Sequence, residues 1–435
     1  MGESIHCFKI DFEKCKGRMA CMRVCPTQAI RVRDGKAVLL SELCIDCGSC
    51  LRACPSGAIS ATTRSLKEFN HFKFKVAVPS PVLFGQFPAD ISPQDIVEGL
   101  KAIGFDAVWV LAVETELLNQ AIREYMRTWK GRLPLISSSC PVIVRLIQVS
   151  YPSMVEQLLH LQPPRELAGH ELKRKYSEEL GLGKDDIGAI YLTSCQAKTM
   201  SILEPAEGEK SNLDGSIGIA DLYNDLLAAA HQVKKANRRK ASARDLLRSI
   251  NLLHWGMSEG QRFNLLDRRY MTLTGLSNMI RALDDVEKGK LRNLDFLEGY
   301  ACWGGCSNGN LTVENLYFAR SKLRNLMPEL EEKDPRLEEE VEERRAREEL
   351  YAKAPIRPRS IRGDQGDLKQ RVKRIMEAES LVSTLPGLNC GLCGTPSCKT
   401  LADDIASGDA TKAQCIFYSK DRLEKLRALY LKDSR

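Results

Sequence analysis

Cysteine content constrains this chain more than any other feature. Sixteen of its 435 residues are cysteine, whereas only six are histidine. Eight cysteines lie in the first 54 residues, four are scattered through the middle, and four lie within 26 residues near the end. The N-terminus lacks the apolar core of a signal peptide, so disulfide bonds are not expected. Metal binding or redox chemistry is the expected use of so many thiols.

Composition excludes several classes of protein. With 43% hydrophobic and 28% charged residues, the chain has the balance of a globular protein with about three domains. No apolar stretch approaches the roughly 20 residues of a membrane span. The net charge of +7 is modest, and Lys and Arg are spread along the chain, so nucleic acid is not an expected partner.

The first group of cysteines contains two related runs. One run is complete and precedes a proline: Cys44, Cys47, Cys50 and Cys54. The other has Arg18 at its second position and three thiols: Cys15, Cys21 and Cys25. This spacing ligates [4Fe–4S] clusters in two-cluster ferredoxins, where the fourth cysteine of each run reaches the other cluster. Residues 1–70 therefore resemble an α+β ferredoxin domain of that type.

The ferredoxin resemblance implies one complete and one incomplete ligand set. The complete set is Cys25, Cys44, Cys47 and Cys50. The incomplete set, which lacks the thiolate replaced by Arg18, is Cys15, Cys21 and Cys54. The alternatives for the second set are a fourth ligand from Cys7 or His6, a [3Fe–4S] cluster, or loss of the metal.

The last group surrounds a glycine-rich turn. Its members are Cys390, Cys393, Cys398 and Cys415. Gly391, Gly394 and Pro396 favour a tight turn, and residues 399–407 favour a helix that ends at Gly408. Residues 379–435 resemble the small, mostly helical [4Fe–4S] domain of Rnf-type electron-transport subunits and corrinoid iron–sulfur proteins. A structural zinc site is the alternative.

The middle cysteines lie in three distinctive segments. Cys140 follows three serines and precedes Pro141, whereas Cys195 is followed three residues later by Lys198. Cys302 and Cys306 lie in a glycine-rich stretch. In this order the segments resemble the [FeFe]-hydrogenase large-subunit domain, over residues 71–315.

That resemblance implies a cluster and a second metal group. In the family, four cysteines hold a [4Fe–4S] cubane, and the last one also bridges to a two-iron subsite carrying CO and cyanide. The implied ligands here are Cys140, Cys195, Cys302 and Cys306, with Cys306 as the bridge. Lys198 occupies the position of the family lysine that hydrogen-bonds a cyanide.

Several positions depart from the pattern of catalytic hydrogenases. Ser139 stands where they have a proton-relay cysteine, and a hydroxyl is a poorer shuttle because its pKa is far higher. Thr193 and Tyr300 replace methionines, and Ser201 replaces a glutamate. Loss of the relay cysteine resembles the sensory branch of the family, although those proteins usually end in a PAS domain.

Hydrophobic periodicity predicts an α/β fold for the middle zone. The expected strands are 76–82, 107–113, 133–137 and 187–192, and the expected helices are 92–103, 115–128, 141–149 and 220–236. Residues 316–378 are expected to form a charged helical segment and linker, with an exposed helix at 329–349. Lysines and arginines at 234–244 form either a docking surface for an acidic ferredoxin or a solvated helix face.

These patterns favour an electron-transfer function. The expected protein contains about four iron–sulfur clusters, mostly [4Fe–4S], and passes electrons within a redox complex, with little or no hydrogen turnover because of Ser139. The alternatives are a hydrogen or redox sensor with a two-iron subsite, or a slow [FeFe]-hydrogenase. Expected partners are ferredoxin or other redox subunits in a hetero-oligomer, in the cytoplasm of an anaerobe.

Overall fold

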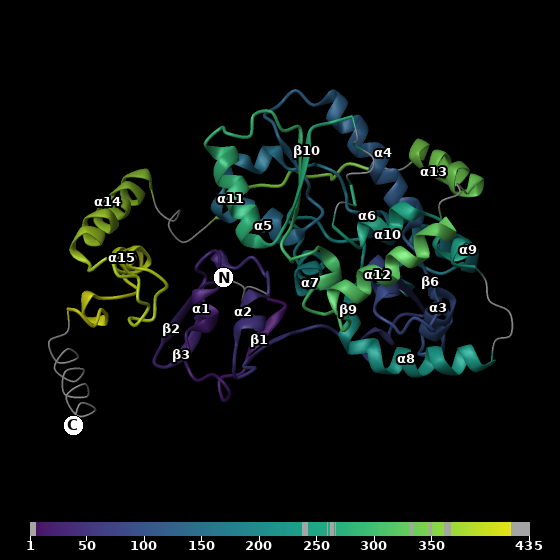
Figure 1. Cartoon of the computed structure of the whole chain (residues 1–435), viewed down its shortest axis with the longest axis horizontal. Helices are drawn as coiled ribbons and strands as arrows, with labels where there is room; N and C mark the ends of the chain where they lie inside the picture. The colour runs from purple at the N-terminus through teal and green to yellow at the C-terminus, as the bar shows by residue number, and fades with distance from the viewer. Residues whose placement is uncertain are drawn as a thin grey trace. The chain divides into compact units, whose positions relative to one another are not determined.

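The computed structural model describes two compact units (Figure 1). Its described residues are 6–236, 242–258, 260–261, 265, 267–330, 334–347, 350–360 and 367–418. The terminal unit joins both ends of the chain, Met1–Ser60 and Arg359–Arg435, and the central unit is Ala61–Pro358. No helix among the described residues combines the length and apolarity that a membrane crossing requires. Of the basic run at 234–244, Arg238, Arg239 and Lys240 lie outside the described residues.

The central unit contains two parallel sheets, which confirms the predicted α/β class. One has the order β6-β5-β8-β9, formed by Ala107–Val108, Phe74–Pro79, Ile187–Thr193 and Gly215–Gly218. The other has the order β10-β11-β7, formed by Tyr270–Thr274, Phe296–Tyr300 and Leu135–Ile136. Every residue of β8 and β11 is buried, as expected for parallel strands covered on both faces.

Helices cover these sheets. They are α3 Pro93–Ala102, α4 Ala112–Thr128, α5 Pro141–Ser150, α6 Pro164–Leu180, α7 Gln196–Leu203, α8 Ile219–Ala236, α9 Ala243–Leu247, α10 Ile250–Trp255, α11 Leu276–Glu287, α12 Leu316–Leu326 and α13 Pro335–Arg347. A capping box of Ser92 and Asp95 starts α3, which packs against α8 (Figure 1). The strand expected at 107–113 stops at Val108, because residues from Ala112 onward bury the helical face of α4.

Helix α13 differs from the exposed helix expected at 329–349. It packs against α4 and buries Leu337 and Val341. Arg344 is 1% exposed and forms an ion pair with Glu114 of α4 at 2.5 Å. The sequence pattern was misleading because only three residues of this Glu- and Arg-rich helix face the protein interior.

The terminal unit combines a ferredoxin-like part with the C-terminal segment. The first part has β1 Phe8–Ile10 paired with β4 Ile59–Ala61, the hairpin β2 Ile30–Arg33 and β3 Lys36–Leu39, and two short helices, α1 Ala20–Arg23 and α2 Ser49–Ala53. The second part has α14 Leu368–Thr384 and α15 Cys398–Ala406. The two parts are joined by a hydrogen bond from the Val32 amide to the Gly394 carbonyl at 2.9 Å.

Candidate iron–sulfur sites

Loops at the carboxyl ends of parallel strands carry the middle cysteines. Cys140 follows β7 and caps α5, and Cys195 follows β8 and caps α7. Cys302 and Cys306 lie in the loop that follows β11. Side chains at the carboxyl ends of parallel strands commonly form binding sites, because the helix that follows turns the chain away and leaves a crevice. This arrangement explains how cysteines far apart in sequence come together.

Three of the four middle thiols interact electrostatically in the structure. Burial raises the pKa of Cys140 to about 11, with further contributions from Cys306 and Cys195. Burial also raises the pKa of Cys195, while the charge of Lys198 opposes the increase. Cys302 lies in the same loop as Cys306, and its carbonyl accepts a hydrogen bond from the Gly305 amide. The geometry therefore suits a cluster of soft thiolate ligands.

Lys198 approaches this group directly. Its Nζ lies 3.6 Å from Cys306 Sγ. Burial alone would lower the pKa of Lys198, but electrostatic interactions with Cys306, Tyr191 and Cys195 raise it overall. A buried ammonium requires a polar or anionic partner, and the sulfur of Cys306 lies within contact distance of it.

A buried hydrogen-bond network connects two positions that depart from the hydrogenase pattern. Gln261 donates its side-chain N–H to Ser139 Oγ at 2.5 Å. The backbone N–H of Gln261 and the hydroxyl of Tyr300 both donate to Glu298 Oε1, at 3.1 and 2.6 Å. Burial, followed by the charge of Glu298, raises the pKa of Tyr300. Gln261 and Glu298 could not be predicted from the sequence, because a single amide and a single carboxylate have no motif spacing.

Gly309 allows the loop after Cys306 to lie close to the loop that carries Cys195. A Cβ added to Gly309 would lie 2.0 Å from the Ser194 carbonyl oxygen. The same carbonyl accepts a hydrogen bond from the Leu311 amide at 2.9 Å. Only glycine fits at this contact, which holds two cysteine-bearing loops together.

The first four-thiol set of the terminal unit lines one cavity. Its members are Cys25, Cys44, Cys47 and Cys50. Backbone amides donate to the sulfur atoms of Cys25 and Cys44, from Ala29 at 3.2 Å and from Asp46 at 3.4 Å. Such N–H···S bonds stabilise thiolate charge and tune cluster potentials.

A second cavity is lined by the remaining ferredoxin thiols. They are Cys15, Cys21 and Cys54. Arg18 also lines this cavity, at the position where a fourth cysteine was expected. His6 lies elsewhere, with its Nδ1 3.3 Å from Asp46 beside Cys44 of the complete set. Cys7 is 2% exposed and does not appear among the described residues that line either cavity, so its role as a ligand stays a prediction.

The C-terminal thiols surround the start of α15. Burial raises the pKa of Cys415, and the charges of Cys393 and Cys398 raise it further, so these three lie close together. Cys390 is held by its backbone, because its carbonyl accepts a hydrogen bond from Arg23 at 3.3 Å. The glycine-rich turn is needed here: Gly394 has φ of +78°, and an added Cβ would lie 1.9 Å from the Val32 carbonyl oxygen.

A buried ion pair anchors the C-terminal segment to β2. Arg31, which is 4% exposed, donates to both carboxylate oxygens of Asp404 at 2.7 and 2.9 Å. Arg33 donates to Asp404 at 2.9 Å and to the Cys393 carbonyl at 3.2 Å. Val32 between them lines the cavity of Cys15, Cys21 and Cys54. The C-terminal thiols therefore lie beside the incomplete ferredoxin set.

Family models match a segment in each of the three zones, and the central match includes Cys140 and Cys195 but ends before Cys302 and Cys306. Residues 73–246 match the iron only hydrogenase large subunit, C-terminal domain. Residues 7–55 match a 4Fe-4S dicluster domain, and residues 385–417 match a family described as a putative Fe-S cluster.

Two curated relatives share part of the chain. NADP-reducing hydrogenase subunit HndD of Solidesulfovibrio fructosivorans is 23% identical over 203 residues, 42% of this chain and 34% of the relative. Iron hydrogenase 1 of Clostridium pasteurianum is 23% identical over 268 residues, 51% of this chain and 46% of the relative. The alignments thus span between a third and a half of these relatives.

Solved hydrogenase structures also align with the chain. The [FeFe]-hydrogenase HydA(deltaEFG) aligns with a TM-score of 0.47 and 16% identity, covering 67% of this chain and 96% of that chain. Apo HydA1 from Chlamydomonas reinhardtii aligns with a TM-score of 0.46 and 15% identity, with coverage of 67% and 96%. The chain thus contains a segment similar to the iron only hydrogenase large subunit, with a segment similar to a dicluster domain before it and a further Fe–S-like segment after it.

Proposed function

We propose that this protein is an electron-transfer subunit of a redox complex, in which a hydrogenase-derived domain has little or no hydrogen turnover. The observation that carries this proposal is the hydrogen bond from the Gln261 amide to Ser139 Oγ. A hydrogenase must deliver protons to its reacting metal, and the expected relay position is Ser139.

The surroundings of Ser139 are unsuited to proton delivery. A serine hydroxyl has a pKa far above that of a thiol, so it seldom exists as the proton acceptor that a relay requires. Its nearest described side-chain partner is a carboxamide, which has no titratable proton to pass on near neutral pH. Tyr300, which replaces a methionine of the family, belongs to the same hydrogen-bond network and adds a bulky phenol to it.

The cysteines assign four cluster sites under this proposal. The terminal unit would hold clusters at Cys25, Cys44, Cys47 and Cys50, at Cys15, Cys21 and Cys54, and at Cys390, Cys393, Cys398 and Cys415. The central unit would hold a cubane at Cys140, Cys195, Cys302 and Cys306. When bound, such clusters supply one-electron redox steps. The chain's own residues donate N–H···S bonds to the thiols of these sites.

The expected partners are other redox proteins in a cytoplasmic complex. One curated relative is named as a subunit of an NADP-reducing hydrogenase, which supports a multi-subunit setting. Electrons would enter or leave through ferredoxin or a comparable subunit.

A sensor or slow hydrogenase with a two-iron subsite is the second candidate. It is favoured by Lys198, whose buried Nζ lies 3.6 Å from the Cys306 sulfur proposed as the bridging ligand. An anionic ligand on a two-iron group would give this cation a further partner.

Infrared spectroscopy separates the two candidates. The protein would be prepared without oxygen beside the hydrogenase assembly proteins, and CO and cyanide stretching bands would be sought together with an iron count. The relay proposal expects no such bands and iron for about four clusters. Bands with stoichiometric intensity would contradict it and favour the sensor or slow enzyme.

A further inference from the structure

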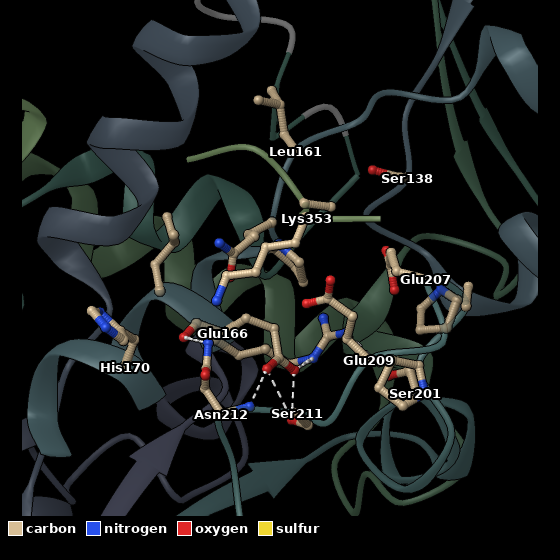
Figure 2. Close-up of a pocket in the computed structure, with 18 of the residues that line it drawn as sticks. Ser138, Leu161, Glu166, His170, Ser201, Glu207, Glu209, Ser211, Asn212 and Lys353 are labelled. Carbon is tan, nitrogen blue, oxygen red and sulfur yellow. Dashed lines mark hydrogen bonds and ion pairs between the residues drawn. The ribbon is translucent and has the colours of Figure 1, made fainter. Parts of the chain in front are cut away.

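The central unit contains a cavity of about 330 Å³ that is separate from the cysteine sites. Figure 2 shows side chains gathered around it from the starts of α5 and α6, from α7, from the loop 205–212 and from the segment after α13. No cysteine is among the described residues that line it. Its volume is at the lower end of the range of small-molecule sites, about 300–1,000 Å³.

Two buried arginines line this cavity. Arg145 is 4% exposed and Arg165 is 8% exposed. Arg165 donates through Nη2 to Ser201 Oγ at 3.0 Å, and its Nε is buried without a hydrogen-bond acceptor among the described residues. That Nε lies 3.8 Å from Glu166 Oε1, beyond hydrogen-bond distance. A buried guanidinium N–H without an acceptor is costly, so a ligand acceptor at this point would be stabilising.

The carboxylate nearest to Arg165 already has other partners. The Ser211 hydroxyl lies 2.9 Å from both carboxylate oxygens of Glu166 and shares its single proton between them, and the Asn212 backbone amide donates to Glu166 at 2.8 Å (Figure 2). These bonds attach the loop 205–212 to α6. Glu166 therefore acts as a structural anchor and neutralises Arg165 only in part.

Cations also outnumber carboxylates at the exposed mouth. The cations that line the cavity there are Lys210, Arg347 and Lys353, and the carboxylates are Glu207 and Glu209. Arg347 donates to Glu171 at 3.0 Å. In the part of the chain that the structure describes, neither Lys210 nor Lys353 forms an ion pair, so both are available to a ligand.

Two helix N-termini add positive potential. Pro141 begins α5 and lines the cavity, and Pro163 and Arg165 line it at the start of α6. The unpaired N–H groups and the dipole of a helix N-terminus favour anions. The second, independent feature here is the buried Arg165 Nε.

We propose that this cavity binds a small multivalent oxyanion, a carboxylate or phosphate compound, with Arg165 as the principal contact. Planar guanidinium groups recognise these anions through paired hydrogen bonds. Ser138 and Pro141 flank Ser139 and Cys140, and Ser201 donates to the Lys198 carbonyl at 2.9 Å. The ligand would thus bind beside the central cysteine loops. The proposal is independent of the electron-transfer function.

Isothermal titration calorimetry on the full-length, cluster-containing protein tests the site. Inorganic pyrophosphate and citrate are the two probes, each titrated at constant ionic strength because salt screens surface attraction. Saturable binding of one equivalent of either probe is expected, and a preference for pyrophosphate or citrate identifies a phosphate or a polycarboxylate ligand. Failure of both probes to saturate would overturn the proposal.

Variants locate the binding. R165Q is expected to weaken binding by about tenfold or more, which is ~1.4 kcal/mol. K353Q, at an exposed rim position, is expected to weaken binding several-fold without risk to folding. R127Q removes an exposed cation of α4 outside the cavity and is expected to bind as the parent does. The proposed site would be wrong if K353Q and R165Q both bound the probe as tightly as the parent protein. It would also be wrong if R127Q lost as much affinity as these two variants.

Discussion

Ser139 differs from a cysteine by one atom, an oxygen in place of sulfur. That atom determines how readily the side chain next to Cys140 can release a proton. S139C is expected to leave hydrogen evolution slow, because the Gln261 amide still contacts the position and Tyr300 and Thr193 still replace the family's methionines. Gas chromatography of hydrogen produced with reduced methyl viologen measures the outcome. S138C, one residue earlier, is the matched control. A positioned general acid accelerates proton transfer by about a hundredfold or more. A rise of that size in the rate of hydrogen evolution, in S139C but not in S138C, would contradict the relay proposal.

Gly309 is a second residue at which one carbon decides the outcome. G309A is expected to force the Cys306 loop away from Ser194, because the added Cβ would lie 2.0 Å from a carbonyl oxygen. We expect a loss of about 1–3 kcal/mol of stability and of roughly one cluster's iron. Iron analysis and thermal unfolding measure both. G183A is the control, since its Cβ meets nothing closer than 3.4 Å; equal iron in both variants would contradict the contact's role.

At the level of single residues, the sequence predicted which thiols form ligand sets but not which side chains lie around them. The spacing of the cysteine runs indicates ligand sets because a cluster needs thiolates at fixed short intervals. Gln261 and Glu298 follow no interval, since parallel strands and loops bring them to Ser139 and Tyr300 from separate parts of the chain. Their role could be recognised only in three dimensions.

Among the helices, α13 depends on one buried ion pair. R344A is expected to destabilise the central unit by about 3–5 kcal/mol, because it leaves the Glu114 carboxylate buried without its cation. R345A removes an exposed pair with Glu124 and is expected to cost less than about 1 kcal/mol. Urea unfolding followed by tryptophan fluorescence compares them, helped by Trp109, whose indole N–H donates to Glu114 at 3.1 Å. Equal costs would show that burial of Arg344 is energetically unimportant.

Helix α15 depends on Asp404 in the same way. D404N is expected to release the C-terminal segment from β2, because two arginines lose their shared carboxylate. Hydrogen exchange of β2 measures this, and the Val32 amide bonded to Gly394 should exchange at least tenfold faster. D403N, at the exposed neighbouring residue, should leave exchange unchanged. Protection retained in D404N would mean that the backbone contacts suffice.

Element boundaries were predictable where one periodicity dominated. The expected helices at 92–103 and 141–149 correspond closely to α3 and α5, whose apolar residues follow a helical repeat. The strand expected at 107–113 fails at its end, since the run 109–113 is apolar and fits either state. Residues 112 and 113 are helical because α4 buries its apolar face in the protein interior.

For the whole molecule, the sequence suggested modules in linear order, whereas the structure joins the first and last. Local motifs report what a segment can bind but not which distant segment it contacts. The pairing depends on Gly394, Val32 and the Arg31–Asp404 ion pair, and no motif in one sequence indicates that these residues contact each other. The C-terminal thiols consequently belong to the same unit as the ferredoxin-like thiols, whereas the linear order of the modules would have placed them beyond the central unit.

The terminal unit's two-part construction has a consequence for biosynthesis. The ribosome releases β2 early, yet its partner Asp404 is made some hundreds of residues later, after the whole central unit. Translation proceeds at about 5–20 residues per second, so Arg31 and Arg33 lack their carboxylate partner for on the order of half a minute. During that interval the nascent ferredoxin part lacks the C-terminal segment that later packs on β2, next to the cavity of Cys15 and Cys21.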